Sequence, residues 1–287
     1  MIRELGIKDS KIENRKSKIG KVIALMLCIG ALPFVNNASA YAQESVEPRT
    51  ESQEVRAKSQ EVRAKSEFTY GAQARVQASY LWRGLYAGGA NIQGSVNVGY
   101  YGVYADMWWN LGVTDMTFRE FQPEVDFSIG FRRWGLDIYA LYIYNFNCGF
   151  FDFGNYIDKG NRLELNVRYT ISDKIPLTFA WGTRVAASDC YLNAAGEIVR
   201  AYSSYAEVSY TQALLDGWSL FGAIGVTPWK GVYNPNGAAL QNIEVRVRKD
   251  WTVSERCGLM LQGQLSVSPM AATNVILPNL AFGVYLR

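Results

Sequence analysis

The chain has 287 residues, of which 29 are Lys or Arg, 26 are Asp or Glu and none is His. The absence of histidine excludes Ser-His-Asp triads, histidine-activated water and histidine metal ligands. The net charge of +3 comes from the first 40 residues, because the remaining residues hold 22 basic and 23 acidic side chains. The charge therefore gives no reason to expect a nucleic-acid partner.

Residues 1–40 have the three parts of a secretory signal peptide. A basic segment, 15–21, precedes a 14-residue apolar run, 22–35, and Ala38-Ser39-Ala40 follows as a small-residue cleavage site. The run is shorter than the roughly 20 residues that a membrane-spanning helix needs. We expect export and cleavage after Ala40, with cleavage after Ala42 as an alternative. Cys28 lacks the preceding small residue that lipoprotein processing prefers.

Residues 41–66 are polar and contain the heptapeptide SQEVRAK twice, at 52–58 and 59–65. Each copy has one large apolar residue, Val55 or Val62, whereas a coiled coil needs two per heptad over several heptads. The segment is therefore predicted to be a solvated periplasmic linker, and a periplasmic docking peptide is the alternative.

Residues 67–287 alternate between apolar and polar side chains, one for one, in about twelve segments. Between 121 and 132, one face carries Phe121, Pro123, Val125, Phe127, Ile129 and Phe131, and the other carries Gln122, Glu124, Asp126, Ser128 and Arg132. This two-residue period is typical of strands. Strands are expected at 68–82, 91–100, 102–113, 121–132, 136–146, 161–171, 175–186, 201–213, 218–228, 240–251, 257–268 and 279–287.

Short and long connections alternate between these strands. The short ones are predicted at 100–102, 133–135, 172–174, 214–217 and 252–256, and the long ones at 83–90, 114–120, 147–160, 187–200, 229–239 and 269–278. An even strand number with this alternation is typical of a transmembrane antiparallel up-and-down β-barrel, with the short turns in the periplasm. The predicted fold is therefore all-β, a barrel of about 12 strands after a cleaved signal peptide.

After an export signal, the apolar face of each strand is expected to meet lipid. In the first, third and last strands this face comprises Phe68, Tyr70, Ala72, Ala74, Val76, Ala78, Tyr80, Trp82, Val103, Ala105, Met107, Trp109, Leu111, Val113, Leu280, Phe282, Val284 and Leu286. Strand ends carry Tyr80, Trp82, Trp134, Tyr169, Trp218, Trp229 and Trp251, as in the aromatic girdles of outer-membrane barrels. The predicted location is the outer membrane of a Gram-negative type of bacterium. The expected partners are its lipid and the barrel assembly machinery, although the chain ends on Arg287 instead of the usual aromatic residue.

The front of the barrel resembles one family. Ser79-Tyr80-Leu81-Trp82-Arg83-Gly84, then Gln93-Gly94, then Gly102-Val103-Tyr104-Ala105 and Trp108, resemble the opening of the TorF-like porin family. Glu124-Val125-Asp126 with Gly130 is similar to its next strand. The resemblance covers about 60 residues. It implies an outer-membrane location and a pore role, without a substrate.

Charged residues on the opposite face of the strands are candidates for pore lining. The candidates are Arg75, Asp106, Glu124, Asp126, Glu164, Arg168, Arg184, Glu207, Glu244, Arg246 and Arg248, and the same face carries Arg83, Arg132, Asp137, Arg162 and Asp250. The expected hairpin registers place Glu164 diagonally from Arg184, and Arg168 and Glu207 on either side of Thr178. So many charges need pairing or water. They form either a salt-bridged packing in a closed barrel, or a ladder with acids on the third to fifth strands facing arginines on the sixth to tenth.

Cysteines add one hypothesis. Cys148 and Cys190 fall in two loops predicted on the outer side, where an oxidising environment allows a disulfide. Cys257, near the opposite rim, would then be a lone thiol. The spacing of the cysteines matches no metal site, and neither a metal nor a cofactor is expected.

The sequence as a whole predicts a narrow, porin-like channel for small ions or solutes and not an enzyme. The first alternative is a closed structural or adhesive barrel. In that barrel the aromatic loop 146–159 binds a ligand, although the same loop could instead fold inward as a plug. The second alternative is a histidine-free enzyme.

Overall fold

A computed structural model describes residues 68–113, 123–157, 160–270 and 276–286. The predicted signal peptide, 1–40, and the predicted linker, 41–66, lie outside these residues and stay predictions. Within the described ranges, no helix is both long and apolar enough to cross a membrane.

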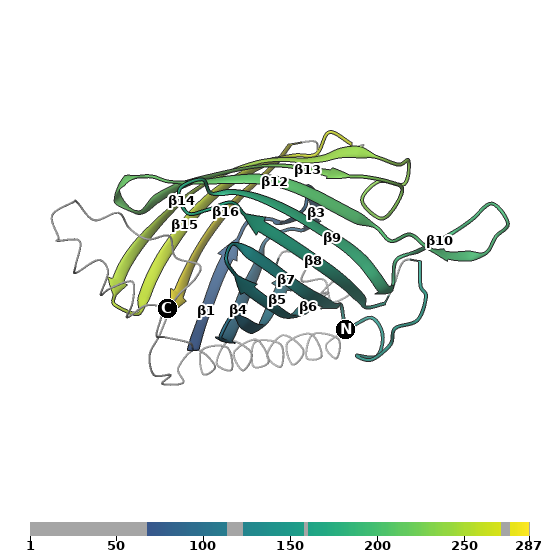
Figure 1. The fold of residues 1–287 in the computed structure, drawn as a ribbon, viewed down its shortest axis with the longest axis horizontal. Helices are drawn as coiled ribbons and strands as arrows, with labels where there is room; N and C mark the ends of the chain where they lie inside the picture. The colour runs from purple at the N-terminus through teal and green to yellow at the C-terminus, as the bar shows by residue number, and fades with distance from the viewer. Residues whose placement is uncertain (1–67, 114–122, 158–159, 271–275, 287) are drawn as a thin grey trace, which may run out of the picture. The chain divides into compact units, whose positions relative to one another are not determined.

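Twelve of the described strands form one closed antiparallel barrel (Figure 1), which confirms the predicted fold class. They are β1 (Phe68–Gln77), β4 (Asn91–Tyr100), β5 (Val103–Gly112), β6 (Glu124–Arg133), β7 (Leu136–Tyr144), β8 (Arg162–Thr170), β9 (Leu177–Ala187), β12 (Ser204–Ala213), β13 (Trp218–Thr227), β14 (Ala239–Ser254), β15 (Cys257–Val267) and β16 (Ile276–Leu286). Each pairs with its neighbour in this order, and β1 pairs with β16 to close the barrel.

Burial alternates along the barrel strands with the two-residue period that the sequence predicts. In β16, the side chains of Leu280 and Phe282 are 58% and 47% exposed, whereas Ala281 between them is 1% exposed. Successive side chains of a strand point to opposite faces. The apolar rows therefore form the outer wall of the barrel and the polar rows its inner wall.

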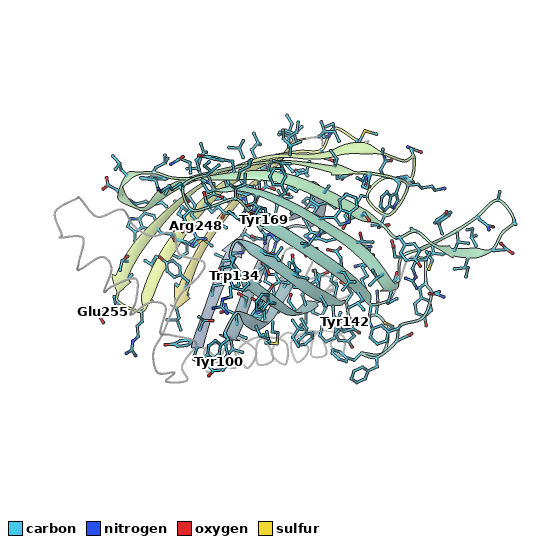
Figure 2. The ribbon with its side chains drawn as sticks, viewed as in Figure 1. Tyr100, Trp134, Tyr142, Tyr169, Arg248 and Glu255 are labelled. Carbon is cyan, nitrogen blue, oxygen red and sulfur yellow. The ribbon has the colours of Figure 1, made fainter. Side chains whose placement is uncertain are left out.

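Short turns gather at one end of the barrel, and Figure 2 shows Tyr100 and Glu255 there. Two of the turns, Tyr101-Gly102 and Trp134-Gly135, have positive φ at both residues (51° and 89°, 54° and 79°). This is the backbone that tight two-residue hairpins require. The connections at the other end are longer, in agreement with the predicted alternation.

The structure corrects the predicted strands in two places. The barrel part of the first strand, predicted at 68–82, ends at Gln77, and β2 (Tyr80–Trp82) pairs instead with β3 (Leu85–Gly88). The loop between β9 and β12, expected without strands, contains a hairpin of β10 (Cys190–Leu192) and β11 (Ile198–Arg200). Figure 1 shows this hairpin extending beyond the barrel rim.

Candidate functional site

The β2–β3 hairpin turns into the barrel lumen. Its bend is fixed at Ser79, whose backbone N–H donates to Asn279 Oδ1 at 2.9 Å and whose hydroxyl donates to the Pro278 carbonyl at 3.2 Å. At its tip, Gly84 packs so closely on β14 that an added Cβ would collide with the Gln241 carbonyl oxygen. The first long connection is therefore a structured insert inside the barrel.

Arg83, at the tip of this hairpin, is bound to the barrel wall by a buried ion pair. Its Nη1 and Nη2 donate to Glu164 Oε2 and Oε1 at 2.9 and 2.6 Å, and Nη2 also donates to Asn166 Oδ1 at 3.2 Å. The Glu164 side chain has no exposed surface. Paired hydrogen bonds between a guanidinium and a carboxylate are among the strongest in proteins. We call the Arg83–Glu164 pair the crossbar, because it joins the inserted hairpin to β8.

Aromatic rings surround the crossbar. The Arg83 guanidinium lies 4.8 Å from the ring of Trp82, 4.9 Å from that of Tyr205 and 5.7 Å from that of Tyr233. Arg83 also donates to the Tyr233 hydroxyl, which comes from the β13–β14 connection. Burial raises the pKa of the Tyr233 phenol, so it stays neutral beside Glu164. The β1–β4 and β13–β14 connections thus meet inside the lumen.

The backbone of Arg83 has a φ of +51°. This left-handed region is unfavourable for a residue with a Cβ, and such residues persist where their surroundings fix them. The turn has the same Xaa-Gly form as the turns at the opposite end. Here, however, the first residue also carries the guanidinium of the crossbar.

Eleven charged candidates were predicted to line a pore, and the structure places all of them on the inner face of their strands, as the burial patterns of these strands indicate. On β5 and β6, Asp106, Glu124 and Asp126 form a row that we call the acidic strip. On β1 and β14, Arg75, Arg246 and Arg248 form the arginine strip. The guanidinium group of Arg75 lies close enough to those of Arg246 and Arg248 to be repelled by both.

Local ion pairs modify the predicted charge ladder. Arg248 donates to Asp250 at 2.8 and 2.7 Å, and Arg246 pairs with Glu244 on the same strand. Arg132 pairs with Asp137 at 2.7 Å across β6 and β7. These ion pairs fit the interpretation as salt-bridged packing, whereas the ladder of acids on the third to fifth strands facing arginines on the sixth to tenth stays a prediction.

A cavity of about 210 Å³ separates the hairpin from the barrel wall. Its lining includes Arg75 of the arginine strip, Asp126 of the acidic strip, and Tyr80 and Trp82 of the hairpin. Since a water molecule occupies about 30 Å³ in the liquid, the space is large enough for several waters. One residue of each strip thus borders the same cavity.

Two predicted registers in this region are wrong. Glu164 lies directly opposite Arg184, not diagonally from it, because the β8–β9 register shifts between Leu163 and Glu164. Arg168 and Glu207 flank Ala180, two residues from the predicted Thr178.

The placement of Tyr80 and Trp82 on the lipid face is also wrong. The Tyr80 hydroxyl donates to Glu124 Oε1 at 2.5 Å, and the Trp82 ring lies 5.6 Å from that of Tyr233. Both side chains belong to the inserted hairpin. The other predicted girdle residues are exposed near strand ends, and they are Trp134, Tyr169, Trp218, Trp229 and Trp251. Tyr233 is a site residue that sequence analysis missed, because a single tyrosine in a long loop gives no periodic signal.

The predicted Cys148–Cys190 disulfide is not formed in the structure. The Cys148 thiol donates to Asn161 Oδ1 at 3.3 Å, and Cys190 is a buried free thiol in β10. Cys257, predicted as a lone thiol, is also free.

The aromatic loop after β7 lies on the outer wall of the barrel. The Phe150 ring is 5.7, 5.3 and 5.1 Å from those of Phe127, Tyr142 and Tyr144, which belong to the outer faces of β6 and β7. Figure 2 shows Tyr142 near this loop. The described part of the loop therefore does not fold inward as a plug.

No protein-family profile matches the chain, and no curated protein matches it. The resemblance to the TorF-like family thus stays a prediction. An outer membrane channel from Pseudomonas putida is 11% identical with a TM-score of 0.45, covering 76% of this chain and 94% of its own. OmpF of Salmonella typhi, in a complex with daunomycin, is 7% identical with a TM-score of 0.33, covering 76% of this chain and 97% of its own. Such low similarity transfers neither a substrate nor a residue role.

Proposed function

We propose that this protein is an outer-membrane β-barrel that acts as a narrow channel for small ions or solutes. The observation that carries the proposal is the cavity that Arg75 and Asp126 both line. Opposite charges across a hydrated constriction orient and select small charged solutes, because charged rows in narrow passages set ionic preference.

The outer wall supports the location. Its exposed large side chains are apolar rows along the strands, including Ile129 at 67%, Val103 at 57% and Leu280 at 58% exposed. Membrane-spanning barrels have such an apolar outside, polar inside and aromatic side chains at both interfaces. We infer lipid as one partner, and the assembly machinery of the outer membrane as another through the apolar rows of β16.

The proposed pore-lining residues are the eleven inward charges, with the two strips as the selective part. The test is single-channel recording in planar lipid bilayers, using full chain purified from the outer membrane of a Gram-negative host. Discrete current steps with a defined ion preference support the channel. The double variant Arg246→Glu with Arg248→Glu should shift that preference toward cations by several-fold, because four units of charge change on one wall.

A matched control is Lys174→Glu, since Lys174 is exposed in the β8–β9 connection, away from both strips. It should leave the ion preference within about 1.5-fold of the parent, because exposed charges are screened within about 10 Å at 0.1 M salt. An equal shift in the control would show that the strips do not select.

The crossbar favours a second candidate, a closed structural barrel. Arg83 and Glu164 hold the inserted hairpin against β8 and fill part of the lumen. A closed barrel predicts no current from folded, inserted protein, and none from Arg83→Gln either. Silence of the parent with conduction by Arg83→Gln would instead identify a gated channel.

A further inference from the structure

A second cavity, of about 140 Å³, lies where the connections after β7, β9 and β13 meet. Its lining includes three cationic side chains, Arg162, Arg184 and Lys230, and one acidic residue, Asp189. The volume equals that of about four or five liquid waters, which suits a small anion. The surplus of positive charge raises the question of what balances it.

Asp189 offsets only one of the three positive charges, and its carboxylate is hydrogen-bonded within the fold. Oδ2 accepts from the Ser203 backbone N–H at 2.8 Å, and Oδ1 accepts from the Ser203 hydroxyl at 2.6 Å. Asp189 and Ser203 are 4% and 0% exposed. The carboxylate therefore ties the two ends of the β9–β12 connection together.

Arg184 is buried, and it forms no ion pair with any acid among the described residues. It is 3% exposed, and its Nε has no hydrogen-bond partner among the described residues. Its guanidinium lies 5.5 Å from the rings of Trp82 and Tyr233. Glu164, directly opposite on β8, is engaged by Arg83. A buried charge without a partner is costly, so an arginine in this position calls for a ligand.

Arg162 adds a second guanidinium to the same cavity. With the Asn145 amide turned to satisfy both neighbours, its oxygen accepts from Arg162 Nη1 at 3.0 Å and its nitrogen donates to Glu124 at 2.7 Å. Arg162 Nε is buried with no partner within the described part of the chain. The positive charges of Arg162 and Arg184 repel each other, and an anion between them would remove that repulsion.

Glu124, the other acid near these two arginines, also receives the Tyr80 hydroxyl. Its two oxygens therefore already have donors from Tyr80 and Asn145. Lys230 is exposed and its Nζ lies 4.7 Å from the Tyr191 ring. The lysine is thus held at the mouth of the cavity, where it can attract an anion from solution.

We propose that this cavity binds one small oxyanion, a phosphate, a sulfate or a short carboxylate, with Arg184 as the buried ligand, Arg162 as the second and Lys230 at the mouth. Planar guanidinium groups match the oxygen pairs of these anions, and a lysine supplies a mobile point charge. The proposal does not require ion flow, so it stands apart from the channel function.

The test is isothermal titration calorimetry of the detergent-solubilised full chain at low ionic strength. Inorganic phosphate, sulfate and acetate are titrated separately, which identifies the preferred oxyanion. We expect saturable binding at one site for at least one of them. Lys230→Met should weaken that binding at least fivefold, and Arg184→Met should abolish it.

Lys174→Met is the matched control, because it also removes one exposed positive charge but lies in the β8–β9 connection. It should keep the affinity within twofold. Heat-modifiable migration in gels establishes that each variant is folded. The proposal is overturned if the folded parent binds none of the three anions, or if Lys174→Met weakens binding as much as Lys230→Met. Calorimetry does not depend on conduction. A folded protein that gives no current in bilayers but binds one of the three anions would therefore refute the channel and leave the anion site standing.

Discussion

Two arginines share the same pair of rings inside the barrel but have different surroundings. Arg83 and Arg184 both lie within 6 Å of the Trp82 and Tyr233 rings. Arg83 holds the Glu164 carboxylate at 2.6 Å, whereas Arg184 has no ion pair within the described ranges. The charge of Arg83 is therefore paired within the fold, whereas the charge of Arg184 is paired only when a ligand occupies the cavity. The comparison teaches that burial and aromatic packing alone do not distinguish a structural arginine from a binding one; the counter-ion does.

The largest expected effect comes from removing the carboxylate of the crossbar. Glu164→Gln leaves Arg83 buried without a counter-ion, and we expect a loss of about 3–5 kcal/mol in the free energy of unfolding. Urea unfolding followed by tryptophan fluorescence measures it. The double variant Arg83→Met with Glu164→Leu should regain most of the loss.

The control for this experiment is Asp250→Asn, which removes the partner of a partly exposed arginine, Arg248. Its expected loss is below about 1 kcal/mol, because solvent screens exposed pairs. Equal losses in Glu164→Gln and Asp250→Asn would mean that burial does not distinguish the crossbar from the pairs along the wall.

A second experiment asks whether the hairpin must reach the lumen wall. Gly84→Ala introduces a Cβ at a φ of +75° and against the Gln241 carbonyl oxygen. Gly196→Ala, in the β10–β11 turn, introduces one at a φ of +78° with nothing within 4 Å. Both should lose about 1 kcal/mol from the backbone conformation. Gly84→Ala should lose about 1–3 kcal/mol more from overpacking, as measured by thermal unfolding.

The smallest expected effect concerns the ring that the two arginines share. Trp82→Leu removes an aromatic face from both guanidinium groups, and each such contact stabilises by about 0.5–2 kcal/mol. We expect the affinity of the Arg184 cavity for the oxyanion that it binds to fall about twofold to fivefold, measured by calorimetry. An unchanged affinity would indicate that the rings do not orient Arg184.

The strand pattern was readable from the sequence because one face of most strands is mainly apolar, which gives a two-residue period. The burial of β16 shows this period most clearly. The same pattern gives a wrong prediction for the inserted hairpin. Tyr80 and Trp82 continue the apolar row of β1, yet the chain bends at Ser79, through contacts with Asn279 and Pro278 about 200 residues later. No local pattern encodes such a long-range contact.

The inward charges were likewise predictable as a group but not as pairs. The alternation of side chains along the strands places Glu164 and Arg184 on the inner face. Which arginine pairs with Glu164 depends on the register shift beside Leu163 and on Arg83 of the inserted hairpin. Tyr233 and Lys230 come from a connection without periodicity. Their positions follow from tertiary packing alone.

The bend at Ser79 ties the inserted hairpin to β16, which follows all the other described strands in chain order. Ala78 and Ser79 both bond to residues of β16, and β16 also closes the barrel against β1. The anchor that directs the hairpin inward thus exists only after the seam has joined. The inward bend of the hairpin and the closure of the barrel are therefore coupled, because both use β16.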